Sequence, residues 1–268
     1  MLAGNHTVCK KLIGIFLIIF IFAGLGWRSE PCDGSEALTE IKPDNTSTVD
    51  FDSFQLVSQY RKAILAAARR HNTLLKVSDE DFARWMEAML ICEMGGVDWL
   101  DKPIYRELGY PIWQGMKLAT SYFGRNSSVG IGQIRPETAA QLEQGWIYHQ
   151  GRKIYHSVRA GFPVSGEGPR GISPQRLAIP EVSIEYLASN LEMGTIVARA
   201  FGYEPTLEDL ARWQNTGMGV WDLKFGNVDF DAWLKGSRYA SKVKGQFQAL
   251  SRINARTLLT EDLVLSFE

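Results

Sequence analysis

The stretch SDEDFARWMEAMLICEMGG, residues 78–96, decides the fold of this chain. Ser78 is a typical N-cap residue, and three acidic residues follow it in the first turn, where the helix dipole favours negative charge. The glycines at 95 and 96 favour a helix end, because glycine tolerates the left-handed conformation found there. The sequence therefore predicts one helix over this stretch.

Glu93 continues the apolar side of this predicted helix. Phe82, Met86 and Met89 recur at helical spacing, and Glu93 takes the next position on the same side. A carboxyl group placed there is expected to point into the core, where the loss of hydration raises its pKa. A general acid that works near neutral pH needs a raised pKa, so Glu93 is the candidate acid. The alternative is an ordinary glutamate that lies at the rim of the core or pairs with an arginine.

The composition is that of a globular protein. The 268 residues are 45% hydrophobic and carry a net charge of -1, which suits one or two domains with a substantial core. A near-zero charge argues against nucleic-acid binding, because such domains usually carry a strong basic excess. The cysteines and histidines do not have the spacing of a metal site, so we expect neither a metal nor another cofactor.

An apolar run near the N-terminus predicts export. Residues 12–27, LIGIFLIIFIFAGLGW, follow Lys10 and Lys11. The run is typical of a secretory signal sequence or a short membrane anchor, and the lysines orient the rest of the chain outward. We predict an extracytoplasmic protein, in the periplasm or at the cell surface. Its parts are a signal or anchor at 1–27, a flexible polar linker at 28–51 and the exported domain at 52–268.

The exported domain is predicted to be mainly helical, with a small hairpin and loop inserted. The helices are expected at 52–72, 78–96, from 136 onward, and at 182–201, 206–213 and 229–263. Residues 146–148 and 153–155 flank Gly151 and predict a hairpin, followed by a loop at 159–173. Cys32 and Cys92 would both be exported, and the sequence leaves their pairing open.

The second informative stretch is SSVGIGQIRPETAAQL, residues 127–142. Gly130 and Gly132 permit close approach of the backbone, and Gln133 places an amide group at that tight point. Pro136 then begins a helix. This turn, glutamine and helix suit the recognition of an amide-bearing ligand, although an ordinary junction between a loop and a helix has the same pattern.

In their order, these pieces resemble the catalytic domain of lytic transglycosylases, which are relatives of goose-type lysozyme. The family signature is a Glu ending a helix, a Ser, a Gly-Leu-Met-Gln-type turn, Pro-x-Thr-Ala, an Asn-Ile helix start and Tyr-Asn-x-Gly. The matching residues here are Glu93, Ser128, Gly-Ile-Gly-Gln at 130–133, Pro-Glu-Thr-Ala at 136–139, Ser183 with Ile184, and Gln-Asn-Thr-Gly at 214–217. The resemblance covers roughly residues 60–217 and implies an α+β lysozyme-like fold.

The resemblance implies a peptidoglycan lytic transglycosylase that cleaves the bond between N-acetylmuramic acid and N-acetylglucosamine. Glu93 would protonate the bridging oxygen, and the substrate's own N-acetyl carbonyl would stabilise the departing centre until the 6-hydroxyl closes a 1,6-anhydro ring. The resemblance implies substrate-binding residues as well. Gln133 and Asn215 would bind amide groups of the substrate, and Ser128 would form a hydrogen bond near the acid. The other implied substrate-binding residues are Gly130, Trp213 and Gln214. Met89, Ile131 and Trp213 would form an apolar wall beside the acid.

Two departures from the family pattern keep other functions open. Met94 replaces the serine after the acid, and Gln214 replaces the tyrosine that touches the acid. A hydrolase would need a second carboxylate to position water, and the local choices are Asp98, Asp101 and Glu107. An inactive peptidoglycan-binding module of an envelope assembly is the third reading. The expected partners are peptidoglycan strands and the membrane, with an envelope or secretion machine as a further candidate and no nucleic acid.

Overall fold

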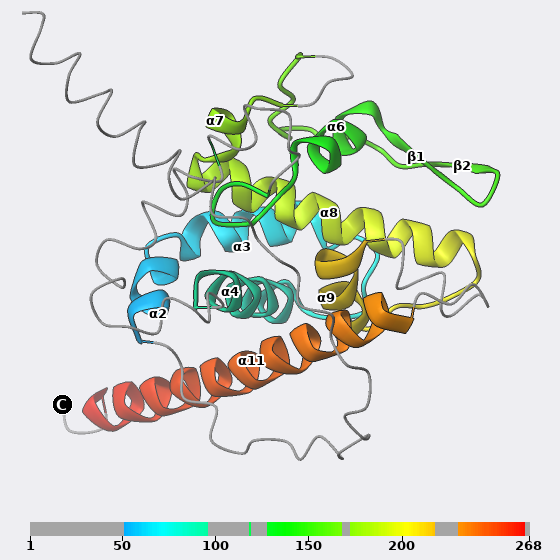
Figure 1. The fold of residues 1–268 in the computed structure, drawn as a ribbon. Coiled ribbons are helices and arrows are strands. Elements are labelled where there is room, and N and C mark those ends of the chain that lie inside the picture. Colours follow the sequence, from blue (N-terminus) through cyan, green and yellow to red (C-terminus); the bar gives the residue numbers. More distant parts are fainter. Residues whose placement is uncertain (1–50, 96–117, 119–127, 168–171, 218–229, 266–268) are drawn as a thin grey trace, which may run out of the picture. The chain divides into compact units, whose positions relative to one another are not determined.

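The structure is a computed structural model that describes residues 51–95, 118, 128–167, 172–217 and 230–265. These residues are mostly helical and include one two-stranded antiparallel sheet, which confirms the mainly helical prediction (Figure 1). They all belong to one compact unit, Thr46–Glu268. The predicted signal or anchor at 12–27 lies outside the described residues. Among the helices that are described, none is both long enough and apolar enough to cross a membrane.

α4, Asp79–Gly95, is the helix on which most of the others pack. The Ser78 hydroxyl accepts a hydrogen bond from the N–H of Asp81 at 3.0 Å, so the predicted N-cap is confirmed. Its neighbours are α2 (Phe51–Ser58), α3 (Arg61–His71), α9 (Leu207–Thr216) and α11 (Phe230–Leu265) (Figure 1).

α4 is buried on more sides than the sequence predicted. Between 82 and 91 every side chain is buried except that of Arg84, which is half-buried. A single apolar side predicts a helix with one face in water, but α4 is covered by helices on several sides. The prediction of one buried side was therefore too narrow.

The prediction of one helix over 52–72 is wrong, because α2 ends at Ser58 and α3 begins at Arg61. The Ser58 hydroxyl donates to the carbonyl of Gln55 at 2.8 Å, and the N–H of Tyr60 donates to the carbonyl of Val57 at 2.9 Å. These bonds span three residues instead of four, so they tighten the last turn and end the helix.

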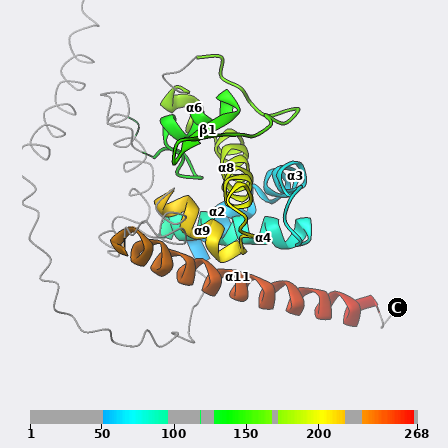
Figure 2. The ribbon, with the colours of Figure 1, turned by 90° about the vertical axis from the view of Figure 1, so that its right-hand side faces the viewer.

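α8, Pro180–Ala200, is the second buried helix, and every side chain from 183 to 195 is buried. Figure 2 shows α6 and the hairpin on one side of α8, and α4 and α11 on the other. The contacting elements are α3, α9, α6 (Pro136–Gln144), α7 (Pro174–Leu177) and β2 (Arg152–Tyr155). The helices predicted from Pro136, at 182–201 and at 229–263 are confirmed, with small shifts of their ends.

The predicted hairpin is confirmed. β1, Trp146–His149, pairs antiparallel with β2, and Trp146 lies opposite Tyr155. Gln150 and Gly151 connect the strands with φ of 46° and 74°, as a two-residue turn with two positive φ angles requires. The helix expected at 206–213 continues as α9 to Thr216, and Thr206 and Asp209 form a capping box at its start.

Candidate functional site

The segment 128–134 is a tight turn closed by its own ends. Val129 and Ile134 exchange backbone hydrogen bonds of 2.9 and 3.1 Å. Inside the turn, Gln133 has a φ of 50°, and its side-chain Nε2 donates to the carbonyl of Gly130 at 2.7 Å. The Ser128 hydroxyl donates to Oε1 of Gln133 at 3.1 Å. Three predicted site residues therefore lie together, and the amide of Gln133 holds the turn itself.

The turn lies directly against the start of α8. Gly130 has a φ of 77°, and a Cβ atom added there would stand 2.0 Å from the carbonyl oxygen of Leu177. The N–H of Gly132 donates to the Ser183 hydroxyl at 2.8 Å. Only a residue without a side chain allows this approach, so Gly130 has a packing role here. A contact of Gly130 with substrate stays a prediction.

Gln214 joins the end of α9 to this turn. Its Nε2 donates to the carbonyl of Gly132 at 3.1 Å, and its Oε1 accepts from Nδ2 of Asn190 at 2.6 Å. Sequence reasoning missed Asn190, although a polar residue inside the apolar sequence of α8 was a usable signal. Gln214 thus bridges two parts of the fold.

Trp213 is part of the core wall beside Gln214. Its indole N–H donates to the carbonyl of Asn190 at 2.9 Å. The ring packs where Gly194 leaves room, because a Cβ atom added to Gly194 would stand 2.8 Å from it. Trp213, Met89 and Ile131 are all buried, and the wall that they were predicted to form beside Glu93 stays a prediction.

A cavity of about 540 Å³ opens between the turn and the end of α9. Four predicted site residues line it although they come from distant parts of the sequence, namely Gln133, Trp213, Gln214 and Asn215. Arg135 and Lys235 also line it, and the sequence carried no signal for them. Glu93 and Ser128 are not among the described residues that line this cavity.

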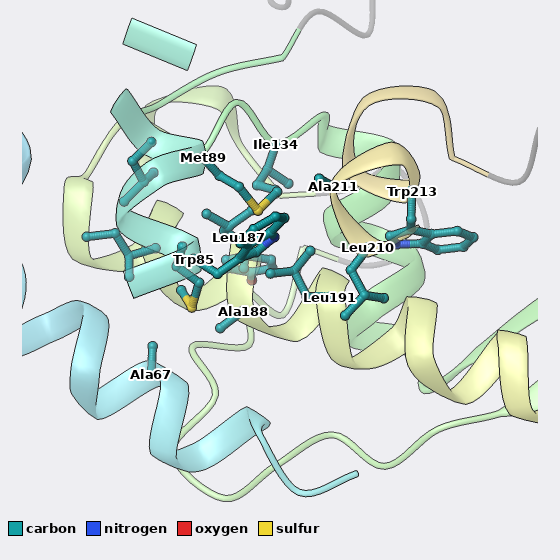
Figure 3. Close-up of a cluster of buried hydrophobic side chains, with 14 of the residues drawn as sticks. Ala67, Trp85, Met89, Ile134, Leu187, Ala188, Leu191, Leu210, Ala211 and Trp213 are labelled. Atoms are coloured by element: carbon teal, nitrogen blue, oxygen red, sulfur yellow. The ribbon is translucent and has the colours of Figure 1, made fainter. Parts of the chain in front are cut away.

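Glu93 lies half-buried near the C-terminal end of α4. Cys92 and Met94 on either side of it pack against the core. Met89, one turn earlier on α4, belongs to the same buried cluster as Ile134, the residue that follows Gln133 (Figure 3). The last turns of α4 and the 128–134 turn therefore contribute to one core.

Tyr239 of α11 stands close to Glu93. Burial raises the pKa of Tyr239 well above its usual range, and the neighbouring charge of Glu93 raises it further. The Tyr239 hydroxyl is buried and interacts with the Glu93 carboxyl, but it makes no hydrogen bond of standard geometry with the described residues. The two groups therefore interact at close range, without a hydrogen bond of standard geometry.

Cys92 is a free thiol beside this pair. Burial and the charge of Glu93 raise the pKa of Cys92 to about 12, which keeps the thiol protonated and unreactive at neutral pH. Cys32, its candidate partner, lies outside the described residues.

Glu87 is another acid of α4, and sequence reasoning missed it. Its side chain is buried, and burial raises its pKa while Arg61 and Arg84 partly offset this effect. Arg61 Nε lies 3.7 Å from Oε1 of Glu87. A perturbed carboxyl on the same helix makes Glu87 the natural rival of Glu93.

The three candidates for a second carboxylate, Asp98, Asp101 and Glu107, lie outside the described residues. Within the ranges that are described, no three His, Cys, Asp or Glu side chains gather as a metal site would require. Comparisons with protein-family models, with curated proteins and with solved structures found no match to this chain.

Proposed function

We propose that this chain is a peptidoglycan lytic transglycosylase with an α+β lysozyme-like fold, and that Glu93 is its catalytic acid. One observation carries the proposal. The segments that resemble the family, at the end of α4, at 128–134 and at the end of α9, all contribute to one packed region (Figure 3). Gln214 bonds the last two segments to each other, and the buried cluster joins the first to both.

The proposed reaction uses one carboxyl group twice. Glu93 donates its proton to the glycosidic oxygen, and the bond from that oxygen to C1 of N-acetylmuramic acid breaks. The N-acetyl oxygen of the same sugar bonds to C1 in its place. Glu93, now ionised, takes the proton of the 6-hydroxyl, whose oxygen displaces the acetyl oxygen from C1. The products are a 1,6-anhydro sugar and a free 4-hydroxyl, and no water is consumed.

The half-buried position of Glu93 supports this role. Its described neighbours include the core side chains of α4 and Tyr239 of α11, and the Glu93 side chain itself is half-buried. A carboxyl in such a setting is more easily protonated than one in water, which is what a general acid requires.

The test is digestion of peptidoglycan by the full chain with Glu93→Gln beside the wild type. Glu87→Gln is the matched control, because it makes the same change on the same helix. We expect the wild type and Glu87→Gln to release 1,6-anhydromuramyl products, detected by mass spectrometry. Glu93→Gln should lower the rate by about 10²-fold or more, since proton transfer is lost.

Three results would overturn the proposal. Reducing ends without anhydro products would identify a hydrolase. Binding of peptidoglycan without cleavage, with Glu93→Gln behaving like the wild type, would identify a binding module. Inactivation by Glu87→Gln and not by Glu93→Gln would move the acid to Glu87.

A further inference from the structure

The described lining of the cavity between the turn and the end of α9 carries positive charge only. Arg135 and Lys235 line it, and both side chains are exposed. Neither has an ion-pair or hydrogen-bond partner among the residues that the structure describes. No Asp or Glu occurs among the described residues of its lining. A hollow with charge of one sign concentrates ligands of the opposite sign, so this cavity favours anions.

The neutral polar side chains of the cavity divide into two groups. The first group is engaged in hydrogen bonds that hold the fold, namely Gln133, Asn190, Gln214 and Thr216. Thr138, Gln141 and Asn215 make no side-chain hydrogen bond within the described ranges. These three side chains keep donors and acceptors for a ligand with amide or hydroxyl groups.

The remaining wall is apolar and comes from Ile147, Met193 and Trp213. A volume of about 540 Å³ lies within the usual range for small-molecule sites. A bare inorganic anion would leave this wall and the three free polar side chains unused. A short peptide with a carboxylate would use the cations, the amide-binding groups and the wall together.

We infer that this cavity binds a carboxylate of the peptide stem carried by N-acetylmuramic acid, with Arg135 and Lys235 as its charge partners. The inference rests on the proposed function, because the glycan strand is what brings the stem to this protein. This inference also changes which of the two predicted amide-binding residues, Gln133 and Asn215, is expected to contact the ligand. Asn215 has an uncommitted amide for the ligand, whereas the amide of Gln133 already holds the turn.

The test compares two probes that differ only in charge, muramyl dipeptide and the same molecule with its carboxylate converted to an amide. Binding is measured by calorimetry on the full chain, since neither probe contains the bond between two sugars that the proposed reaction would cleave. We expect the charged probe to bind about tenfold more tightly than the neutral one. Arg135→Gln and Lys235→Gln should each remove most of this preference. Lys62→Gln, which removes an exposed cation from α3, should leave it unchanged.

Equal binding of the two probes, or an unchanged preference in both cavity variants, would overturn the inference. Inorganic phosphate that displaces the dipeptide at equal concentration would also overturn it, since the site would then recognise any anion. Cleavage of peptidoglycan without a charge preference in binding would refute this inference alone. Charge-dependent binding without cleavage would support it and refute the proposed catalysis.

Discussion

The hydroxyl of Tyr239 and the carboxyl of Glu93 approach each other from two helices that are far apart in the sequence. In the family that the sequence resembles, a tyrosine at the position of Gln214 touches the acid. Here Gln214 is engaged with Gly132 and Asn190. The phenol next to Glu93, the proposed acid, instead comes from α11, and its buried hydroxyl makes no hydrogen bond of standard geometry in the described chain.

We expect Tyr239→Phe to separate stability from activity. Because this buried hydroxyl makes no well-formed hydrogen bond, removing it should change the free energy of unfolding by no more than about 1 kcal/mol. If the hydroxyl donates to ionised Glu93 during the reaction, its loss should slow cleavage. The upper limb of the pH–rate profile should move to higher pH, because the carboxylate loses a donor that stabilises its charged form.

Urea unfolding and a pH profile of peptidoglycan cleavage measure both effects. A merely structural role would change the unfolding curve and leave the shape of the pH profile as in the wild type. That pattern would contradict the assignment of Tyr239 as a positioning residue for Glu93.

At the scale of elements, a comparison of two glycines shows why the 128–134 turn requires glycine at position 130. Gly130 and Gly151 both have a positive φ, of 77° and 74°. A Cβ atom on Gly151 would meet nothing within 4 Å, whereas one on Gly130 would strike the backbone at Leu177. The hairpin turn therefore needs only an unusual φ, but the 128–134 turn also needs close packing on α7 and α8.

The matched substitutions Gly130→Ala and Gly151→Ala separate these two requirements. Gly151→Ala should cost about 1–2 kcal/mol of stability, the usual cost of a side chain at positive φ. Gly130→Ala should cost more than about 4 kcal/mol, because backbone atoms of neighbouring elements must move. Denaturant unfolding of both variants checks this, and similar losses would mean that the turn can shift away from α7.

At the scale of the whole molecule, a buried ionic cluster ties three parts of the chain together. His71 of α3 lies between two glutamates of α8, with Nε2 3.0 Å from Glu185 and Nδ1 2.8 Å from Glu192. Arg70 of α3 also binds Glu185, and Arg159 of the loop after the hairpin binds Glu192. Both ring nitrogens face carboxylates, so His71 is held in its charged form.

The same cluster holds the loop expected at 159–173. Besides the contact of Arg159, the hydroxyl of Tyr186 lies 2.7 Å from the carbonyl oxygen of Pro163 and shares its proton between that oxygen and the carboxylate of Glu143. The described part of this loop, up to residue 167, is therefore fastened to α8 at two points. Residues 168–171 lie outside the described residues.

The cluster predicts how stability depends on pH. Burial opposes the charge of His71, but Glu185 and Glu192 outweigh it and raise the pKa of His71 above 6.5. The stabilisation from His71 is complete below pH 6.5 and is lost as the pH rises through this higher folded pKa. Burial lowers the pKa of His156 below 6.5, so its contribution has the opposite sign and is lost as the pH falls.

We therefore expect stability to be highest near pH 6.5 and to decrease on the alkaline side. Urea unfolding across this range measures it, with His71→Gln and His156→Gln compared with the wild type. His71→Gln should abolish the alkaline decrease, and His156→Gln should leave it in place. An alkaline decrease that persists in His71→Gln would show that another group causes it.

At acidic pH the carboxylates of the cluster should resist protonation. Burial would raise the pKa of Glu185, but hydrogen bonds from Arg70 and His71 lower it to about 2. The stabilisation from Glu185 is present above the unfolded value of 4.5 and is lost as the pH falls towards 2.

The sequence by itself determined most helices, their caps and the hairpin. Ser78, Thr206, Pro136 and Gly151 act through bonds and dihedral angles of their own neighbourhood, so their effects are readable without the fold. Even there the periodicity hid the break after Ser58, because both α2 and α3 keep helical spacing across it.

Only the tertiary structure decided which partners the polar groups meet. The side-chain amides of Gln133 and Gln214 are bonded inside the fold, whereas Asn215, Arg135 and Lys235 line the cavity. Tyr239 lies beside Glu93, and His71 lies between two glutamates. The physical reason is that periodicity predicts which side of a helix is buried, whereas a hydrogen bond depends on positions within a few ångströms. Those positions are set by how distant segments pack, and no local pattern encodes them.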